Sequence, residues 1–309
     1  MIELQDLRRY FGQTKAVDGV SFAVYAGQVF GYIGPNGAGK TTSMRILATL
    51  DVPTSGDALV DGFSVVNDPD RVRRRLGFMP DFFGTYANVN VEEYIDFFAR
   101  AYRLRGADRR RAVRRVMEFT GLDVLADKPI QALSKGMKQR LCLGRALIHD
   151  PAVLVLDEPA AGLDPRARIE LREMIRTLAA AGKTVLISSH ILTELAEICH
   201  VVGILERGRL VAVGSVQEIQ QRCQTPQIAV EVEVLDSTDT LGKWLADRPG
   251  ISQVQADGQV VRFLHSGNSA EAAELLKGMI ESGFRVTAFG RRRQSLEDVF
   301  MQVTKGLVQ

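Results

Sequence analysis

Residues 34–42 combine glycines, a lysine and two threonines at a spacing that suits phosphate binding. They lie between a β-branched run at residues 29–33 and a helical pattern at residues 41–50. Glycine-rich turns can aim many backbone N–H groups at one anion, and the amino end of the next helix adds partial positive charge. We expect Lys40 to reach the β- and γ-phosphates of a nucleotide and the Thr41 hydroxyl to serve Mg²⁺. The predicted phosphate-binding residues are Gly34, Pro35, Asn36, Gly37, Ala38, Gly39, Lys40, Thr41 and Thr42.

Two carboxylates, Asp157 and Glu158, follow the apolar run at residues 153–156. Asp157 at the end of a strand can hold Mg²⁺, commonly through its waters, while Glu158 can polarise a water for attack on a γ-phosphate. A charged pair at a strand end is usually only solvated. The phosphate-binding segment upstream favours the catalytic interpretation.

His190 and the stretch around Ser134 are further candidates for contacts with phosphate. His190 follows a β-branched run at residues 184–188, and the carboxyl end of such a strand is where an α/β sheet presents ligand groups. A lone histidine is more often structural. Ser134 is a favoured helix N-cap, and the free N–H groups there bind any anion, so an ordinary cap and an anion site both remain open.

The elements that position these residues form an alternating pattern of β-branched runs and helical stretches, which predicts an α/β domain with a mostly parallel sheet. Residues 69–127 contain helical patterns at 91–102 and 109–119, so we expect an almost strand-free helical insert. The other predicted strands and helices are residues 29–33, 153–156, 184–188 and 201–205, and residues 41–50, 166–181, 191–199 and 216–222.

A different pattern begins after the polar segment at residues 221–226, which predicts a domain boundary. The order is β-α-β-β-α-β, the ferredoxin-like arrangement, with an Asp257-Gly258 turn between the middle strands. The predicted elements are strands 228–235, 251–255, 260–264 and 284–289, helices 238–247 and 269–282, and a closing helix at 295–303.

Composition limits the alternatives. The chain has 309 residues and a formal charge of +2, which suits one large and one small domain and gives no global argument for nucleic-acid binding. Its three scattered cysteines indicate reduced thiols in the cytoplasm and not a disulfide framework. The acidic amino end argues against a secretory signal, and no window approaches 18 apolar residues, so we expect no membrane span.

Residues 133–140, with the sequence LSKGMKQR, resemble the signature motif of ABC ATPases, normally LSGGxxQR. Further family elements follow in the right order: Phe11 resembles the aromatic that stacks on adenine, residues 161–164 the D-loop ending at Asp164, His190 the switch histidine, and residues 71–81 the approach to the Q-loop. The resemblance covers roughly residues 2–222. It implies a P-loop NTPase fold of the ABC ATPase type, with a helical subdomain at about residues 82–150.

The resemblance also implies ligands and partners. ATP and Mg²⁺ would bind at the phosphate loop, and Ser134 and Gly136 would cap the γ-phosphate held by a second subunit. The expected assembly is a head-to-tail homodimer, or a heterodimer with a paralogue, working on separate transmembrane permease subunits at the cytoplasmic face of the membrane. No nucleic-acid partner is expected.

The sequence departs from the family pattern at two positions. Asp81 stands where a glutamine normally touches Mg²⁺ and the attacking water; aspartate still offers oxygen ligands, so we expect a magnesium or coupling role with altered turnover. Lys135 replaces the first signature glycine and should add positive charge at the dimer interface. Residues 71–115 hold 12 arginines against five acids, a feature that fits a solvated face or a docking surface equally well.

These patterns predict an ATP-hydrolysing ABC transporter subunit with an ATPase domain at residues 1–222 and a small α+β ferredoxin-like domain at residues 227–309. The stretch at residues 295–300 looks like the closing helix of type-2 exporter subunits, which favours export and a regulatory or dimer-stabilising role for the second domain. The alternatives are a soluble ABC ATPase outside transport and a nucleotide-dependent regulator that hydrolyses ATP weakly.

Overall fold

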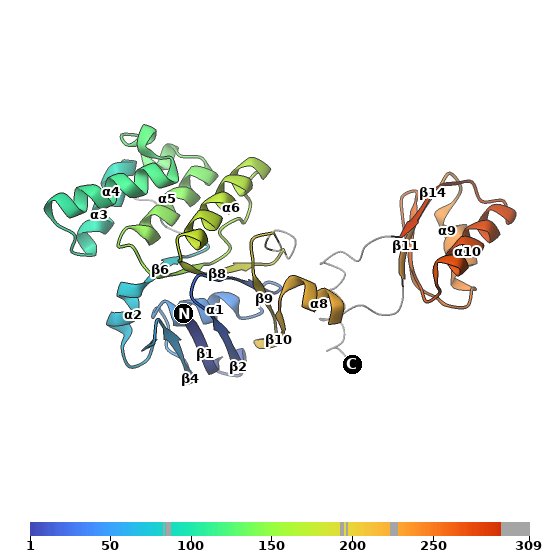
Figure 1. Cartoon of the computed structure of the whole chain (residues 1–309), viewed down its shortest axis with the longest axis horizontal. Helices are drawn as coiled ribbons and strands as arrows, with labels where there is room; N and C mark the ends of the chain where they lie inside the picture. Colours follow the sequence, from blue (N-terminus) through green and yellow to red (C-terminus); the bar gives the residue numbers. More distant parts are fainter. Residues whose placement is uncertain (83, 85–87, 192–194, 196, 223–227, 292–309) are drawn as a thin grey trace. The chain divides into compact units, whose positions relative to one another are not determined.

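A computed structural model describes the chain except for residues 83, 85–87, 192–194, 196, 223–227 and 292–309. The chain divides into two compact units, Met1–Ile219 and Gln220–Gln309. Each unit has its own sheets and helices (Figure 1). Among the described residues, no helix has the length and apolar character that a membrane span needs.

A six-stranded sheet forms the centre of the first unit, in the order β10-β9-β3-β8-β7-β6. All neighbouring strands in it are parallel except β10, which pairs antiparallel with β9. The four strands expected from their β-branched runs are confirmed, and with them the α/β class: β3 (Val29–Ile33), β7 (Val153–Leu156), β8 (Thr184–Ser189) and β9 (Val201–Glu206).

The expectation of an almost strand-free insert at residues 69–127 is wrong at its start. Strand β6 (Leu76–Met79) lies there and pairs with β7 as the edge of the parallel sheet. It is only four residues long and contains Gly77, so its β signal is weak. A Cβ on Gly77 would lie 2.2 Å from the carbonyl oxygen of Ala146, which shows how closely helix α5 (Lys135–Leu147) packs against this strand.

A second sheet in this unit, which sequence patterns did not predict, has the order β2-β1-β4-β5. Its two longest strands pair antiparallel with several register shifts, which interrupt the alternation that would reveal them. The two sheets share one apolar core, where Phe22 stacks on Phe30 at 4.7 Å between ring centroids. Besides β6, the strands that the sequence patterns did not predict are β1 (Ile2–Phe11), β2 (Thr14–Val24), β4 (Ser55–Val60) and β5 (Phe63–Ser64) of this sheet and β10 (Arg209–Gly214) of the central sheet.

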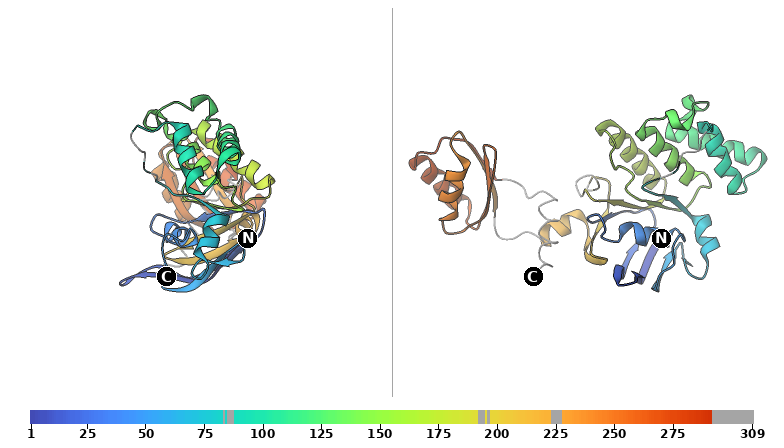
Figure 2. Two further views of the ribbon diagram at one scale, coloured as in Figure 1. Left: turned by 90° about the vertical axis from the view of Figure 1, so that its left-hand side faces the viewer. Right: turned by 180° about the vertical axis from the view of Figure 1, so that it is seen from behind.

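Helices lie on both sides of the central sheet. Figure 1 shows α3, α4, α5 and α6 gathered on one side of β6 and β8, with α1 and the strands β1, β2 and β4 on the other, and the rear view in Figure 2 shows the same grouping. The helices are α1 (Lys40–Leu47), α2 (Pro69–Arg75), α3 (Val91–Ala101), α4 (Gly106–Thr120), α5 (Lys135–Leu147), α6 (Pro165–Ala180) and α8 (Val216–Arg222), with short 3₁₀ turns η1 (Asp123–Leu125) and η2 (Ile130–Ala132).

The second unit has the predicted β-α-β-β-α-β order. Its antiparallel sheet runs β12-β13-β11-β14, and both helices cover one face of it (Figure 1). Its elements are β11 (Ile228–Val234), α9 (Thr238–Ala246), β12 (Ile251–Asp257), β13 (Val260–His265), α10 (Ser269–Glu281) and β14 (Val286–Arg291). The expected helices at residues 191–199 and 295–303 lie partly and wholly outside the described residues.

Candidate functional site

The phosphate-loop segment connects β3 to α1, as its spacing predicts. Gly37 and Gly39 have φ angles of +81° and +105°, a region that favours glycine. The loop is also pressed against neighbouring backbone, because a Cβ on Gly34 would lie 2.3 Å from the Leu205 oxygen and one on Gly39 2.1 Å from the Ala16 oxygen. These three positions therefore require glycine.

Lys40, the first residue of α1, is buried, and only 5% of its side chain is exposed. Its Nζ donates to the Gly34 oxygen at 2.5 Å and to the Pro35 oxygen at 3.2 Å. The same ammonium lies 3.3 Å from Glu158 Oε1. Lys40 thus joins the phosphate loop to the carboxylates at the end of β7.

Asp157 is fully buried at the carboxyl end of β7. Its Oδ1 accepts a hydrogen bond from the Ser188 hydroxyl at 2.6 Å, and the Thr41 side chain also hydrogen-bonds this carboxylate. Burial raises the pKa of Asp157 above its ordinary value; the bonds from Ser188 and Thr41 oppose that shift, and the charges of Asp81 and Glu158 add to it. A cation would restore the charged form.

One oxygen of this carboxylate, Asp157 Oδ2, is buried and has no hydrogen-bond partner in the part of the chain that the structure describes. The Thr41 hydroxyl contacts the same carboxylate, and Asp81 is close enough to act on it electrostatically. Carboxylate and hydroxyl oxygens are the ligands that Mg²⁺ prefers. The three residues fit the predicted magnesium site.

The Glu158 carboxylate lies between the side chains of Lys40 and His190. Its Oε2 lies 2.8 Å from His190 Nδ1, its Oε1 forms the ion pair with Lys40, and its backbone N–H donates to the Ser188 hydroxyl at 2.8 Å. Its φ angle is +47°, which is uncommon for a residue other than glycine. The chain therefore turns sharply here and directs this carboxylate toward Lys40 and His190.

Strand ends explain how these residues meet. Asp81 follows β6 after one proline, Asp157 and Glu158 follow β7, and His190 follows β8, while the phosphate loop follows β3. These neighbouring strands are parallel, so their carboxyl ends share one edge of the sheet. Asp81 itself is exposed, and its Oδ1 accepts from the Phe82 N–H at 2.8 Å.

Ser134, Gly136 and Asp164 lie apart from this cluster. Ser134 caps α5 by accepting from the Met137 N–H at 3.3 Å, and Asp164 caps α6 by accepting from the Ala167 N–H at 2.9 Å. All three residues line one hollow of about 300 Å³ between the two helix starts. No described contact joins them to the phosphate loop of the same chain.

Lys135, the residue that departs from the signature pattern, reaches toward the D-loop of its own chain. A Cβ on Gly162 would lie 2.2 Å from Lys135 Nζ, and Gly162 has a φ angle of +64°. The Lys135 ammonium therefore lies where the Cβ of any other residue at position 162 would be. This contact depends on the side-chain conformation of Lys135, so spacing alone could not reveal it.

Phe11 ends β1 and is 49% exposed, so one part of its ring is open to a ligand. Ser188 is a residue of the site that the sequence motifs do not predict, because its hydroxyl lies within the strand before His190. Its hydroxyl bridges Asp157 and the Glu158 backbone. The signal was a hydroxyl residue at the end of a buried strand beside the carboxylates.

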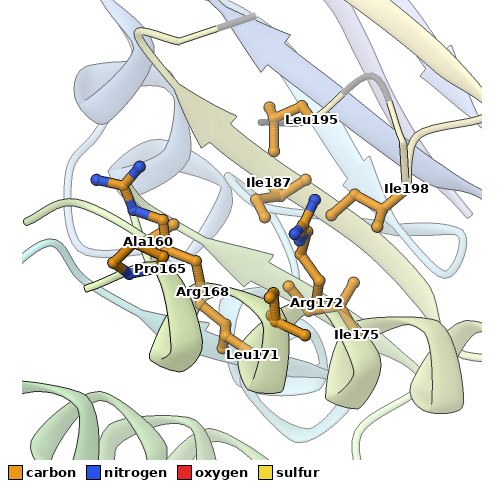
Figure 3. A pocket seen from close by; sticks show the side chains of 10 residues that line it. Ala160, Pro165, Arg168, Leu171, Arg172, Ile175, Ile187, Leu195 and Ile198 are labelled. Atoms are coloured by element: carbon orange, nitrogen blue, oxygen red, sulfur yellow. The ribbon is translucent and has the colours of Figure 1, made fainter. Parts of the chain in front are cut away.

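An apolar cavity of about 270 Å³ lies between α6 and β8 (Figure 3). Ile175 and Leu171 on α6 and Ile187 on β8 line it, together with Arg168 and Arg172 of α6. Its described lining contains no carboxylate, histidine or thiol. This cavity therefore lacks the groups needed for phosphate chemistry, which gather instead at the strand ends.

Comparison with known proteins agrees with this geometry. A profile described as ABC transporter matches residues 17–161, and one described as the C-terminal domain of ATP-binding protein DrrA1-3-like proteins matches residues 214–304. The Nod factor export ATP-binding protein I of Ralstonia nicotianae is 35% identical over 98% of this chain and 94% of its own length. The chain belongs to the ABC transporter ATP-binding protein family. The resemblance inferred from residues 133–140 is confirmed.

Other relatives and structures support the same family. A probable multidrug ABC transporter ATP-binding protein of Escherichia coli is 40% identical over 71% of this chain, which corresponds to 38% of that protein. A solved ATP-binding subunit of an ABC transporter has a TM-score of 0.65 and 30% identity, covering 72% of this chain and 92% of that one. A dimeric bacterial ABC transporter cassette has a TM-score of 0.63 and 25% identity, covering 70% and 98%. The ATPase fold is therefore confirmed for the first unit.

Proposed function

We propose that this family member is the ATP-hydrolysing subunit of an ABC exporter and that it acts on separate membrane subunits. The observation that carries the proposal is the position of the Glu158 carboxylate, between Lys40 of the phosphate loop and His190, beside the buried Asp157. This arrangement puts a general base next to the groups that hold a γ-phosphate and a cation.

The residues divide the work between binding and chemistry. Phe11 stacks on the base, while the backbone of residues 34–42 and the amino end of α1 bind the phosphates. Lys40 exchanges its contacts with the Gly34 and Pro35 oxygens for phosphate oxygens. Thr41, Asp157 and Asp81 would hold Mg²⁺, which would supply charge that neutralises the phosphates.

Glu158 accepts a proton from the attacking water, and His190 contacts the γ-phosphate and orients the carboxylate through its 2.8 Å contact. Ser188 fixes the positions of Asp157 and Glu158 relative to each other, because its hydroxyl contacts the carboxylate of the first and the backbone N–H of the second. Asp81, one residue beyond Pro80, serves as a magnesium ligand or as the residue that couples the site to the membrane partner.

The second half of the site comes from another subunit. Ser134, Gly136 and Asp164 line a hollow of their own and make no described contact with the phosphate loop of the same chain. A head-to-tail dimer brings them to the partner's nucleotide. Both a homodimer and a heterodimer with a paralogue satisfy this geometry, with the subunits bound peripherally to permeases at the cytoplasmic face of the membrane.

Export is supported by the relatives. Several relatives that match 98% of the chain are named Nod factor export ATP-binding proteins, and another, which matches 71% of it, is named for multidrug transport. The relatives do not favour a soluble ABC ATPase outside transport. Copurification with an integral membrane protein, and not with RNA, supports the transport role; copurification with RNA alone contradicts it.

The Glu158→Gln variant tests the chemistry. We expect ATP turnover to fall by about 10²- to 10⁴-fold, because the amide cannot accept the proton, while ATP still binds. ATP should then hold the variant as a dimer, which light scattering on a sizing column measures. Glu173→Gln is the matched control, because Glu173 lies on α6 in an exposed ion pair with Arg176. Turnover at the wild-type rate in Glu158→Gln removes Glu158 from the mechanism.

A further inference from the structure

Phe11 is covered on one face by a cation of its own strand. The Arg9 guanidinium lies over the Phe11 ring, 4.3 Å from the ring centroid. The ring nevertheless keeps 49% of its exposure. A planar ligand can therefore stack on the face opposite Arg9.

The Arg9 side chain is held by the carboxylate of Asp51. Its Nη2 lies 2.8 Å from Asp51 Oδ1, its Nε donates to Asp51 Oδ2 at 3.3 Å, and the two side chains are only 25% and 19% exposed. The Asp51 carboxylate is fixed in turn, because its Oδ1 accepts from the Val52 N–H at 2.8 Å. A two-point contact of this kind orients the plane of a guanidinium.

The loop that contains Asp51 is also fastened to the backbone of β1. The Thr54 N–H donates to the Arg8 oxygen at 2.7 Å, and the Tyr10 N–H donates to the Thr54 hydroxyl at 2.9 Å. This loop follows α1, the helix that begins with Lys40 in the phosphate loop. The strand end that presents Phe11 is thus tied to the segment that continues from the phosphate loop.

We infer that Arg9, held by Asp51, is a positioning residue for the base of the bound nucleotide: it fixes the Phe11 ring so that the base stacks on the open face. The inference rests on the proposed function, in which Phe11 receives the base. A ring that is already oriented loses less conformational freedom when a base stacks on it, so a nucleotide binds more tightly. A ligand that has phosphates but no base gains no affinity in this way.

An exposed ion pair by itself contributes little and would leave ligand binding unchanged. Two features distinguish Arg9 from such a pair: it is three-quarters buried, and it covers the ring face opposite the open one. A cation–π contact that is partly removed from water corresponds to about 3- to 10-fold in an equilibrium constant. Its loss frees the Phe11 ring, so ATP binding should weaken by up to that range. That range is measurable.

The test measures equilibrium binding of two ligands, ATP and inorganic tripolyphosphate, by calorimetry with EDTA present to stop turnover. Arg9→Ala should weaken ATP binding about 3- to 10-fold and leave tripolyphosphate binding unchanged. Asp51→Asn should weaken ATP binding less, because Arg9 keeps its ring contact. Arg248→Ala is the matched control, since Arg248 lies 4.2 Å from the centroid of Trp244 in the second unit.

A double variant separates positioning from general damage. Once Phe11→Ala has removed the ring, adding Arg9→Ala should cause no further loss of ATP affinity. Equal weakening of both ligands, or additive losses in the double variant, overturns the inference. If Phe11→Ala weakens ATP binding and Arg9→Ala does not, the inference fails while the proposed base contact stands. If Phe11→Ala leaves ATP binding unchanged, both the base contact and the inference are wrong, whereas the Glu158→Gln result still tests hydrolysis.

Discussion

The single hydroxyl of Ser188 contacts both the Asp157 carboxylate and the backbone of Glu158. Its hydroxyl donates to Asp157 Oδ1 at 2.6 Å and accepts from the Glu158 N–H at 2.8 Å. Because Asp157 is fully buried, that bond is one of the few contacts that favour its charged form. The hydroxyl therefore affects both the carboxylate that we propose binds the metal and the direction of the proposed general base.

Ser188→Ala should lower ATP turnover about 10-fold and raise the Mg²⁺ concentration needed for half-maximal turnover. The physical reason is that a buried carboxylate oxygen without its partner costs about 1–3 kcal/mol and raises the pKa of Asp157 further. Steady-state ATPase assays across a Mg²⁺ titration measure both effects. Ser21→Ala is the control, because the described hydrogen bond of the Ser21 hydroxyl is an exposed one, accepted from the Asp6 N–H. An unchanged Mg²⁺ dependence in Ser188→Ala contradicts this role.

At the scale of elements, His149 joins three parts of the first unit. It follows α5, its ring stacks on Tyr102 after α3 with centroids 3.8 Å apart, and its Nε2 lies 3.2 Å from the Leu76 oxygen at the start of β6. Burial lowers the pKa of His149 to about 4, an effect that the Leu76 oxygen only partly opposes. The ring is neutral at physiological pH.

The lowered pKa predicts that this unit loses stability on acidification. In the unfolded chain the histidine has a pKa near 6.5, so between that pH and about pH 4 the unfolded state binds more protons than the folded one. The stability contributed by neutral His149 is present above pH 6.5 and is lost as the pH falls, by about 3 kcal/mol. Urea unfolding at pH 7.5 and pH 4.5 measures the loss.

His149→Phe supplies the comparison, because phenylalanine keeps a flat ring against Tyr102 and does not titrate. The pH-dependent loss should be smaller in the variant by the amount that His149 contributes. Parallel pH dependences in the two proteins mean that other groups cause the acid sensitivity.

Sequence patterns predicted the central strands well because uninterrupted runs of β-branched and other apolar residues have few alternatives. Val153 to Leu156 is buried throughout, and such a run fits a strand covered on both faces. Strand β1 was missed because its pairing with β2 shifts register between Leu4 and Leu7 and again afterwards, so its side chains do not alternate regularly. Strand β6 was missed because four residues with a glycine give little signal.

The site was predictable to the extent that strand ends determine it. Asp157, Glu158 and His190 meet because parallel strands place their carboxyl ends at one edge. The contacts of Ser188, Lys135 and Arg9 depend on side-chain conformation and on loops distant in the sequence, so no spacing rule reveals them. Arg9 and Asp51, for example, are 42 residues apart.

At the scale of the whole molecule, each unit has its own apolar core. In the second unit the described core includes Val232, Leu241 and Met279, all completely buried, and Phe263, which is 2% exposed. These residues come from the strands and helices of that unit. The core therefore stabilises a fold that carries none of the described groups around Glu158.

Phe263→Ala should destabilise the second unit by about 3–5 kcal/mol, because it removes a buried ring and leaves a cavity. ATP binding to the first unit should stay unchanged. Denaturant unfolding followed by the fluorescence of Trp244, the single tryptophan, measures the first effect, and calorimetry measures the second. Leu235→Ala is the control, because Leu235 is 55% exposed and should change stability little. A loss of ATP affinity in Phe263→Ala would show that the two units are not independent.

The eight-residue helix α1 lies between the phosphate loop and the loop that binds the end of β1. Each residue added to a helix advances it by about 1.5 Å and turns it by about 100°. One inserted residue in α1 would therefore swing Asp51 and Thr54 away from β1 while the phosphate loop stayed where it was. Insertions and deletions should be tolerated at the exposed turn around Gly12 and excluded from residues 40–47. Related proteins can then differ in the length of their surface loops but not in the separation between the base and phosphate contacts.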